Sequence, residues 1–190
     1  MRLTCVTMSG ADETIQASEL VHVTRAFPFV EWGICLSTRA GKQGKPTIPG
    51  RIWLSELSKI TALPIAVHLC GRYVADLIRG RFTFPERFPE LFGQCRRVQI
   101  NLRSTRTPLT DRSRLLAAIS RFPEPEYIFQ QDSFDLAPVR SATECGLRAS
   151  ILFDTSGGRG RAPSTWPPRD GVSGGYAGGL RPDNLVAQLK

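Results

Sequence analysis

Five polar residues interrupt segments that are otherwise rich in β-branched and aromatic residues, and they are the first candidates for chemistry. They are Glu31, His68, Gln99, Asn101 and Asp154. A polar side chain in a buried strand is costly unless it is paired or functional. Because carboxyl and imidazole groups transfer protons, these residues predict either a general acid–base site or a polar layer whose members satisfy one another.

Glycine is concentrated in two segments, DTSGGRG at 154–160 and GGYAGGL at 174–180. Glycine lets backbone N–H groups approach a ligand closely, and a helix N-terminus that follows favours an anion. These segments predict a phosphate site, with ordinary tight turns as the alternative. Since neither continues as G-K-[ST] and no G-x-G-x-x-G turn follows the first strand, no ATP, NAD or other cofactor is expected. The glycines concerned are Gly157, Gly158, Gly178 and Gly179.

The elements that must position these residues recur along the chain. Strand-like runs lie at 2–7, 29–37, 65–70, 97–102, 126–131, 149–154 and 172–177. They are spaced roughly 22 to 35 residues apart, which is too far for hairpins. Most of the gaps carry helical patterns, at 16–26, 51–61, 71–80, 111–121 and 182–190. The gap 132–148 leaves little room for a helix, because it holds Pro138 and Gly146.

Strand–helix repeats of this kind predict an α/β fold with a parallel sheet, and seven in succession favour a (β/α) barrel over a doubly wound sheet. Apolar and polar positions alternate within the runs, as in Val30, Trp32 and Ile34 against Glu31, Gly33 and Cys35. If the apolar set faces the helices, the five polar candidates converge on the barrel interior. Those near the strand ends would then lie where barrel active sites are found.

The C-terminal third of the chain resembles phosphoribosylanthranilate isomerase. ILFDTSGGRGRAPSTW is similar to that family's L-D-T segment, glycine-rich loop and following Trp, and GYAGGLRPDNL is similar to its seventh strand and the helix after it. Nearly the whole chain more strongly resembles an uncharacterised bacterial group of isomerase-like barrels. That resemblance is carried by SGADE at 9–13, FVEWGICLS at 29–37 and HLCG at 68–71.

The resemblance implies an aldose–ketose (Amadori-type) isomerisation, an intramolecular oxidation–reduction, on a small phosphorylated sugar-type substrate, as in tryptophan biosynthesis. It implies that Asp154 is the general acid that opens the ribose ring. The family's base is a Cys followed by Gly at the end of strand one, and Cys5 is the nearest match, although Val6 follows it. His68 or Cys70 on strand three is the alternative base, and His68 equally fits a hydrogen-bonded interior histidine.

The chain accounts for seven strands and ends inside a seventh helix. We therefore expect one domain over 1–190, a TIM (β/α)8-type barrel truncated after its seventh strand and helix, with the eighth βα unit missing. Open sheet edges favour association, so self-association is one way to cover them. Two other functions stay open, a degenerate phosphate-binding barrel without catalysis and a basic nucleic-acid-associated protein.

Composition narrows the class of protein. The 190 residues are 41% hydrophobic, which excludes global disorder. No run approaches the roughly 20 apolar residues of a membrane span, so no membrane partner is expected. Five cysteines without C-x-x-C spacing predict free thiols in a reducing cytoplasm, and no metal site. The net charge of +8 comes from scattered Lys and Arg, so a nucleic-acid partner is not expected.

Overall fold

Seven parallel strands form one sheet whose spatial order follows the chain, β1-β2-β3-β4-β5-β6-β7. The structure is a computed structural model that describes residues 4–37, 49–60, 63–107, 109, 111–133, 135–157, 159–166, 173–181 and 183–188. Gly158 lies outside the described residues. The strands are β1 (Val6–Ser9), β2 (Val30–Leu36), β3 (Ile65–Leu69), β4 (Cys95–Asn101), β5 (Glu126–Gln131), β6 (Ala149–Phe153) and β7 (Gly174–Tyr176).

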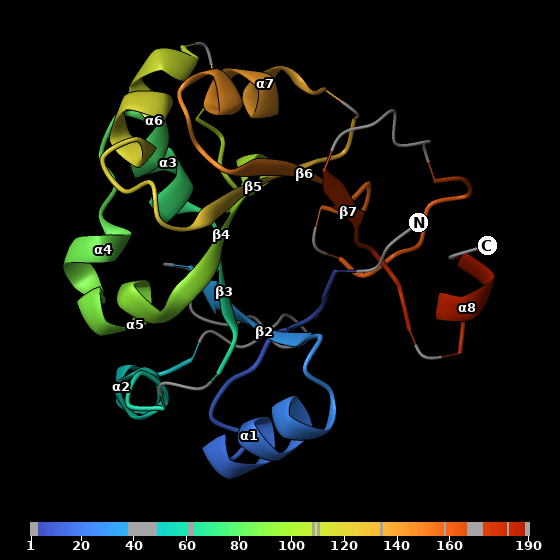
Figure 1. Cartoon of the computed structure of the whole chain (residues 1–190). Coiled ribbons are helices and arrows are strands. Elements are labelled where there is room, and N and C mark those ends of the chain that lie inside the picture. Colours follow the sequence, from blue (N-terminus) through green and yellow to red (C-terminus); the bar gives the residue numbers. More distant parts are fainter. Residues whose placement is uncertain are drawn as a thin grey trace.

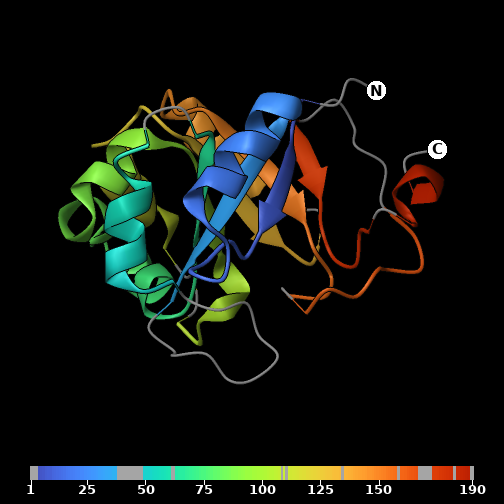
Figure 2. The same cartoon turned by 90° about the horizontal axis from the view of Figure 1, so that it is seen from below.

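The helices between the strands lie on the outside of the curled sheet, and the last helix follows β7, away from the sheet (Figures 1 and 2). They are α1 (Ala17–Ala26), α2 (Arg51–Leu57), α3 (Arg72–Ile78), α4 (Phe84–Arg87), α5 (Pro89–Gln94), α6 (Arg112–Ile119), α7 (Ala137–Glu144) and α8 (Leu185–Gln188), with a 3-10 turn, η1 (Leu102–Ser104). The strands are parallel and follow the chain order, and the helices between them cover one face of a curled sheet, as in part of a (β/α) barrel. A doubly wound sheet is excluded, because its strand order reverses and its helices cover both faces. The α/β part of the prediction is therefore confirmed.

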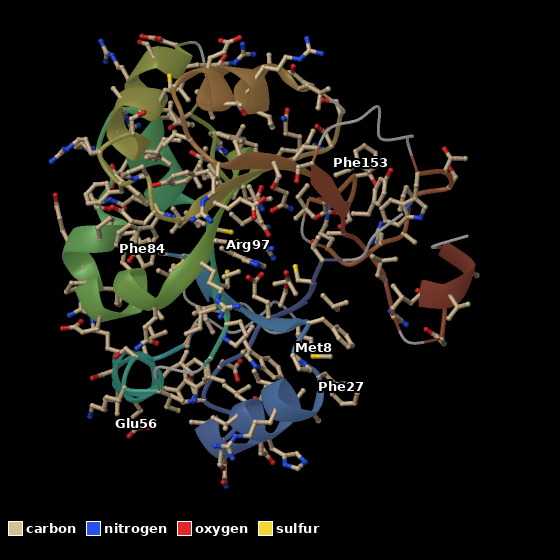
Figure 3. The ribbon with its side chains drawn as sticks, viewed as in Figure 1. Met8, Phe27, Glu56, Phe84, Arg97 and Phe153 are labelled. Carbon is tan, nitrogen blue, oxygen red and sulfur yellow. The ribbon has the colours of Figure 1, made fainter. Side chains whose placement is uncertain are left out.

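The hydrophobic core fills the space between the helices and the outer, convex face of the sheet. Val30, Trp32, Ile34 and Leu36 of β2 all belong to this core, as the alternation predicted. Phe84, at the start of α4, is fully buried on this side and packs edge-on against Phe92 (Figure 3). The residues between these core positions consequently face the inner, concave side of the sheet.

The structure differs from the prediction in three parts of the chain. The expectation of no helix in the gap 132–148 is wrong, because α7 occupies it. Pro138 lies in the first turn of α7, where no intrahelical N–H bond is lost, and Gly146 follows the helix with a φ of 79°. The first strand begins at Val6, later than predicted. The short helices α4 and α5, between α3 and β4, were not predicted.

Within the described residues, β1 and β7 are the two edges of the sheet, since β1 pairs only with β2 and β7 only with β6. Apolar side chains are exposed in β1 and in the segment that leads into β2, among them Met8 and Phe27 (Figure 3). Among the described helices, none has the length and apolar character that crossing a membrane would require.

Candidate functional site at the carboxyl ends of the strands

The inner face of the sheet carries polar side chains at both ends of its strands. At the amino ends, Arg97 of β4 points into the curve of the sheet (Figure 3). Its guanidinium lies 3.3 Å from both carboxylate oxygens of Glu31 and donates to Glu126 at 2.8 Å. Arg97 also contacts the Cys5 thiol, and Thr7 donates to Glu31 at 2.9 Å. We call these five residues the amino-end cluster.

The amino-end cluster contains two predicted site residues, Glu31 and Cys5. Cys5 precedes β1 and so lies at its amino end, whereas Asp154 follows the last residue of β6. In an all-parallel sheet these positions are at opposite ends. The structure therefore does not bring Cys5 and Asp154 together, and Glu31 is held by an ion pair.

At the carboxyl ends, Asp154 is the end of a buried hydrogen-bonded chain. Gln99 Nε2 donates to Gln130 Oε1 at 2.7 Å, and Gln130 Nε2 donates to Asp154 Oδ2 at 2.7 Å. Asp154 Oδ1 accepts from the backbone N–H of Ser156 at 2.9 Å and from its hydroxyl at 2.6 Å. The Asp154 residue is only 3% exposed. We call Gln99, Gln130, Asp154 and Ser156 the carboxyl-end chain, and it fixes the orientation of the carboxylate.

The two glycine-rich loops meet at Asp154. A Cβ on Gly178 would lie 2.9 Å from Asp154 Oδ1 and 2.8 Å from the Arg161 carbonyl oxygen. A Cβ on Gly179 would lie 2.4 Å from the Ala162 nitrogen. Both glycines also have positive φ, 101° and 68°, which L residues rarely adopt. The loop after β7 thus fits against the loop after β6 only because these two residues have no side chain.

The loop after β6 is also organised by Ser156. Its hydroxyl accepts from the backbone N–H groups of Arg159 and Gly160 at 3.0 and 3.1 Å. After β7, Asn184 accepts from the Arg181 N–H and donates to the Gly179 carbonyl, each at 2.8 Å. Side chains therefore hold both loops in defined conformations. The described helix α8 spans only Leu185–Gln188, so the loops and not a long helix form the candidate phosphate site.

His68 lies on the inner face near the carboxyl end of β3, buried and 9% exposed. Its ring lies over Gly33 of β2, where a Cβ would come within 2.9 Å of two ring atoms. His68 Nε2 is buried without a hydrogen-bond partner. Desolvation by this burial lowers the pKa of His68 to about 4, so the imidazole is neutral near pH 7.

This pKa predicts a pH dependence of stability. The unfolded histidine has a pKa of about 6.5, so between pH 6.5 and 4 the unfolded state binds more protons than the folded state. We expect the contribution of His68 to the free energy of unfolding to be complete above pH 6.5. It should fall by about 3 kcal/mol as the pH drops to 4. Urea unfolding of His68→Gln should lack this part of the pH dependence, whereas His22→Gln should keep it; identical profiles for both variants would refute it.

Three more polar groups lie near the carboxyl ends of β2, β3 and β4. Asn101 Nδ2 lies 3.9 Å from the Cys70 sulfur, and Asn101 Oδ1 is buried without a partner. Cys35 lies near the carboxyl end of β2, and Cys70 directly follows β3, the strand paired with β2. Of the predicted residues, the structure therefore gathers His68, Asn101 and Asp154 near the carboxyl ends, with Gln99 connected to Asp154 through Gln130.

Sequence reasoning missed Arg97, Gln130 and Ser156. Arg97 and Gln130 lie at inner-face positions of their strands. The alternation of apolar and polar residues in β4 and β5 could therefore have identified both. Ser156 lies two residues after Asp154, a spacing at which a carboxylate commonly accepts from the backbone N–H. Among the described residues, no three His, Cys, Asp or Glu side chains are grouped so that they could hold a metal ion.

Comparisons with known proteins place the chain in no known family. No protein-family model matches it. No curated protein and no solved structure matches it either.

Proposed function

We propose that the carboxyl-end face of the sheet binds a small phosphorylated sugar-type substrate and catalyses its aldose–ketose (Amadori-type) isomerisation. The observation that carries this proposal is the meeting of the two glycine-rich loops at the Asp154 carboxylate. A proton-transferring group and a loop pair suited to an anion are thereby adjacent. Active sites of parallel α/β sheets lie at this end of the strands.

The phosphate would lie on the two loops. Positive-φ glycines turn backbone N–H groups toward a common point, which favours an anion. Arg159, Arg161 and Arg181 lie in the same loops and are exposed, so their positive charges add to the attraction. Of the charges that give the chain its net charge of +8, these three are the ones placed to attract the phosphate of the substrate.

Proton transfer would use two groups on the inner face. In the proposed reaction Asp154 donates a proton to the ring oxygen, and the ring opens. The neutral imidazole of His68 then removes the C2′ proton, and the resulting enol tautomerises to the ketose. His68 is assigned the role of base because Cys5 lies at the amino ends of the strands. The chain from Gln99 through Gln130 holds Asp154 in position for this step.

A second candidate is a phosphate-binding protein without catalysis, and the position of Cys5 favours it. The base that the isomerase resemblance implies is missing from the carboxyl end. The two candidates share the phosphate site and differ in turnover. Binding and turnover are therefore measured separately.

The phosphate site is tested by Gly178→Ala, with Gly146→Ala as the matched control. Both glycines have positive φ, but a Cβ on Gly146 meets nothing within 4 Å, whereas on Gly178 it meets Asp154 and Arg161. Titration calorimetry with inorganic phosphate should show at least about tenfold weaker binding for Gly178→Ala, since displacement of the loop costs more than about 1.4 kcal/mol. Gly146→Ala should bind like the parent protein. Equal affinities for all three proteins, or no binding by any, would contradict the proposal.

A further inference from the structure

Two of the five cysteines lie together on the sheet. Cys35 is near the end of β2, and Cys70 directly follows β3, the neighbouring strand. The Cys70 N–H donates to the carbonyl of Leu36, next to Cys35 in the chain, at 2.9 Å. Cys35 is paired with His68 in the strand register, so Cys70 lies two residues further along the neighbouring strand, on the same face of the sheet. Both residues are partly exposed. Hydrogen peroxide can therefore reach a pair of adjacent sulfur atoms.

We propose that Cys35 and Cys70 form a dithiol that hydrogen peroxide oxidises to a disulfide. This inference goes beyond the proposed function and does not depend on it. It rests on the adjacency of the two thiols and on the polar group beside them, the Asn101 amide at 3.9 Å from the Cys70 sulfur.

Cys35 is the sulfur that attacks first. The hydrogen bond from Cys70 lowers the pKa of the Cys35 thiol, against the opposing effect of burial, and raises the pKa of Cys70. The thiolate is the nucleophile, so Cys35 reacts before Cys70. Its sulfur attacks one peroxide oxygen, the O–O bond breaks, and the other oxygen leaves as hydroxide that takes up a proton to form water. Cys35 is then a sulfenic acid.

Cys70 completes the reaction. Its sulfur attacks the sulfenic sulfur of Cys35, the S–O bond breaks, and the hydroxyl leaves as water with the proton of the Cys70 thiol. Two thiols and one peroxide thus give one disulfide and two waters. In the strand register Cys35 lies opposite His68, so Cys70 must move to close the bond. Cys70 lies outside β3, beyond Leu36 and Leu69, the last register pair of β2 and β3, so the movement breaks the bond from the Cys70 N–H to Leu36 but no pair within the strands.

The other three thiols have no such neighbour in the described part of the chain. Cys95 is buried, and desolvation raises its pKa to about 12, which keeps it protonated. Cys145 is exposed at the end of α7. Cys5 contacts Arg97 at the opposite end of the sheet. A bond between Cys35 and Cys70 is therefore the specific product.

The test treats the folded protein with a small excess of hydrogen peroxide, then counts free thiols and maps peptides by mass spectrometry. We expect the thiol count to fall from five to three, with the loss of two hydrogen masses and a cross-link between the peptides of Cys35 and Cys70. The matched control Cys145→Ser should also lose two thiols, whereas Cys35→Ser should form no cross-link. Circular dichroism checks that both variants are folded. If a variant is unfolded, the peptide map of the parent protein alone tests the proposal.

Three results would overturn the inference. They are an unchanged thiol count, oxygen added to single cysteines without a cross-link, or a cross-link between any other pair. Because the thiol count and the peptide map measure the cysteines themselves, these results do not depend on phosphate binding or isomerase activity. The absence of isomerase activity would therefore not contradict the dithiol proposal, and the absence of a disulfide would not contradict the proposed function.

Discussion

Asp154→Asn is expected to lower turnover of a phosphorylated sugar-type substrate by about 10²- to 10⁴-fold, the usual contribution of one general acid or base. The amide has the shape of the carboxyl group but has no proton to donate. It can still accept from Ser156, and the amides of Gln130 and Gln99 can turn over to meet its new N–H donor. The loss should therefore appear in kcat, with the fold and phosphate binding retained.

Growth of a tryptophan auxotroph that lacks phosphoribosylanthranilate isomerase gives a direct readout, supported by rate measurements on the purified protein. Asp132→Asn is the matched control, since Asp132 is an exposed carboxylate just after β5, paired with Arg103 at the same end of the sheet. It should leave turnover unchanged. Equal turnover by the parent and Asp154→Asn would contradict the role of Asp154. Phosphate binding without turnover by the parent would favour the non-catalytic candidate.

Arg97→Met is expected to lower the free energy of unfolding by about 3–5 kcal/mol, as the removal of one partner of a buried ion pair generally does. Glu31 has only 4% of its side chain exposed, and Arg97 lies 3.3 Å from it. Without the guanidinium, the Glu31 carboxylate would be buried with Thr7 as its remaining hydrogen-bond donor among the described contacts. Urea denaturation at neutral pH measures the change.

Arg103→Met is the control for this second prediction. The ion pair of Arg103 with Asp132 is about half exposed, so its removal should cost no more than about 1 kcal/mol. The double variant Arg97→Met/Glu31→Gln should recover part of the loss, because the uncompensated charge is gone. Similar unfolding free energies for Arg97→Met and Arg103→Met would show that the amino-end cluster does not stabilise the fold.

Much of the fold could be predicted from local patterns. The spacing of apolar runs predicted seven strands, and the alternation in β2 predicted which of its residues would enter the core. The helix α7 was missed because Pro138 was read as a helix breaker. Its effect depends on position, since a proline in the first turn has no N–H bond to lose. Such a position depends on where the helix begins, which the pattern of the gap does not specify.

The candidate site was predictable only in part. Asp154 was identified from the segment that ends β6, and the glycines from their density. The partition of polar residues between the two ends of the sheet depends on where each strand starts. The first strand was predicted at 2–7 but begins at Val6, so Cys5 lies at the amino end of the strand and not within it. The chain from Gln99 through Gln130 to Asp154 requires the register of three strands, which the sequence of one strand does not contain.

The most direct test of the central claim is an NMR titration of the isotopically labelled protein with ribose 5-phosphate. The central claim is that the loops after β6 and β7 form an anion site at Asp154. It predicts that the largest shifts fall on the backbone amides of these loops, among them Ser156, Gly160, Gly178 and Gly179. The amides of Glu31 and Arg97, at the other end of the sheet, should barely shift. Shifts that are absent from the two loops, or that are largest around Arg97, would contradict the claim.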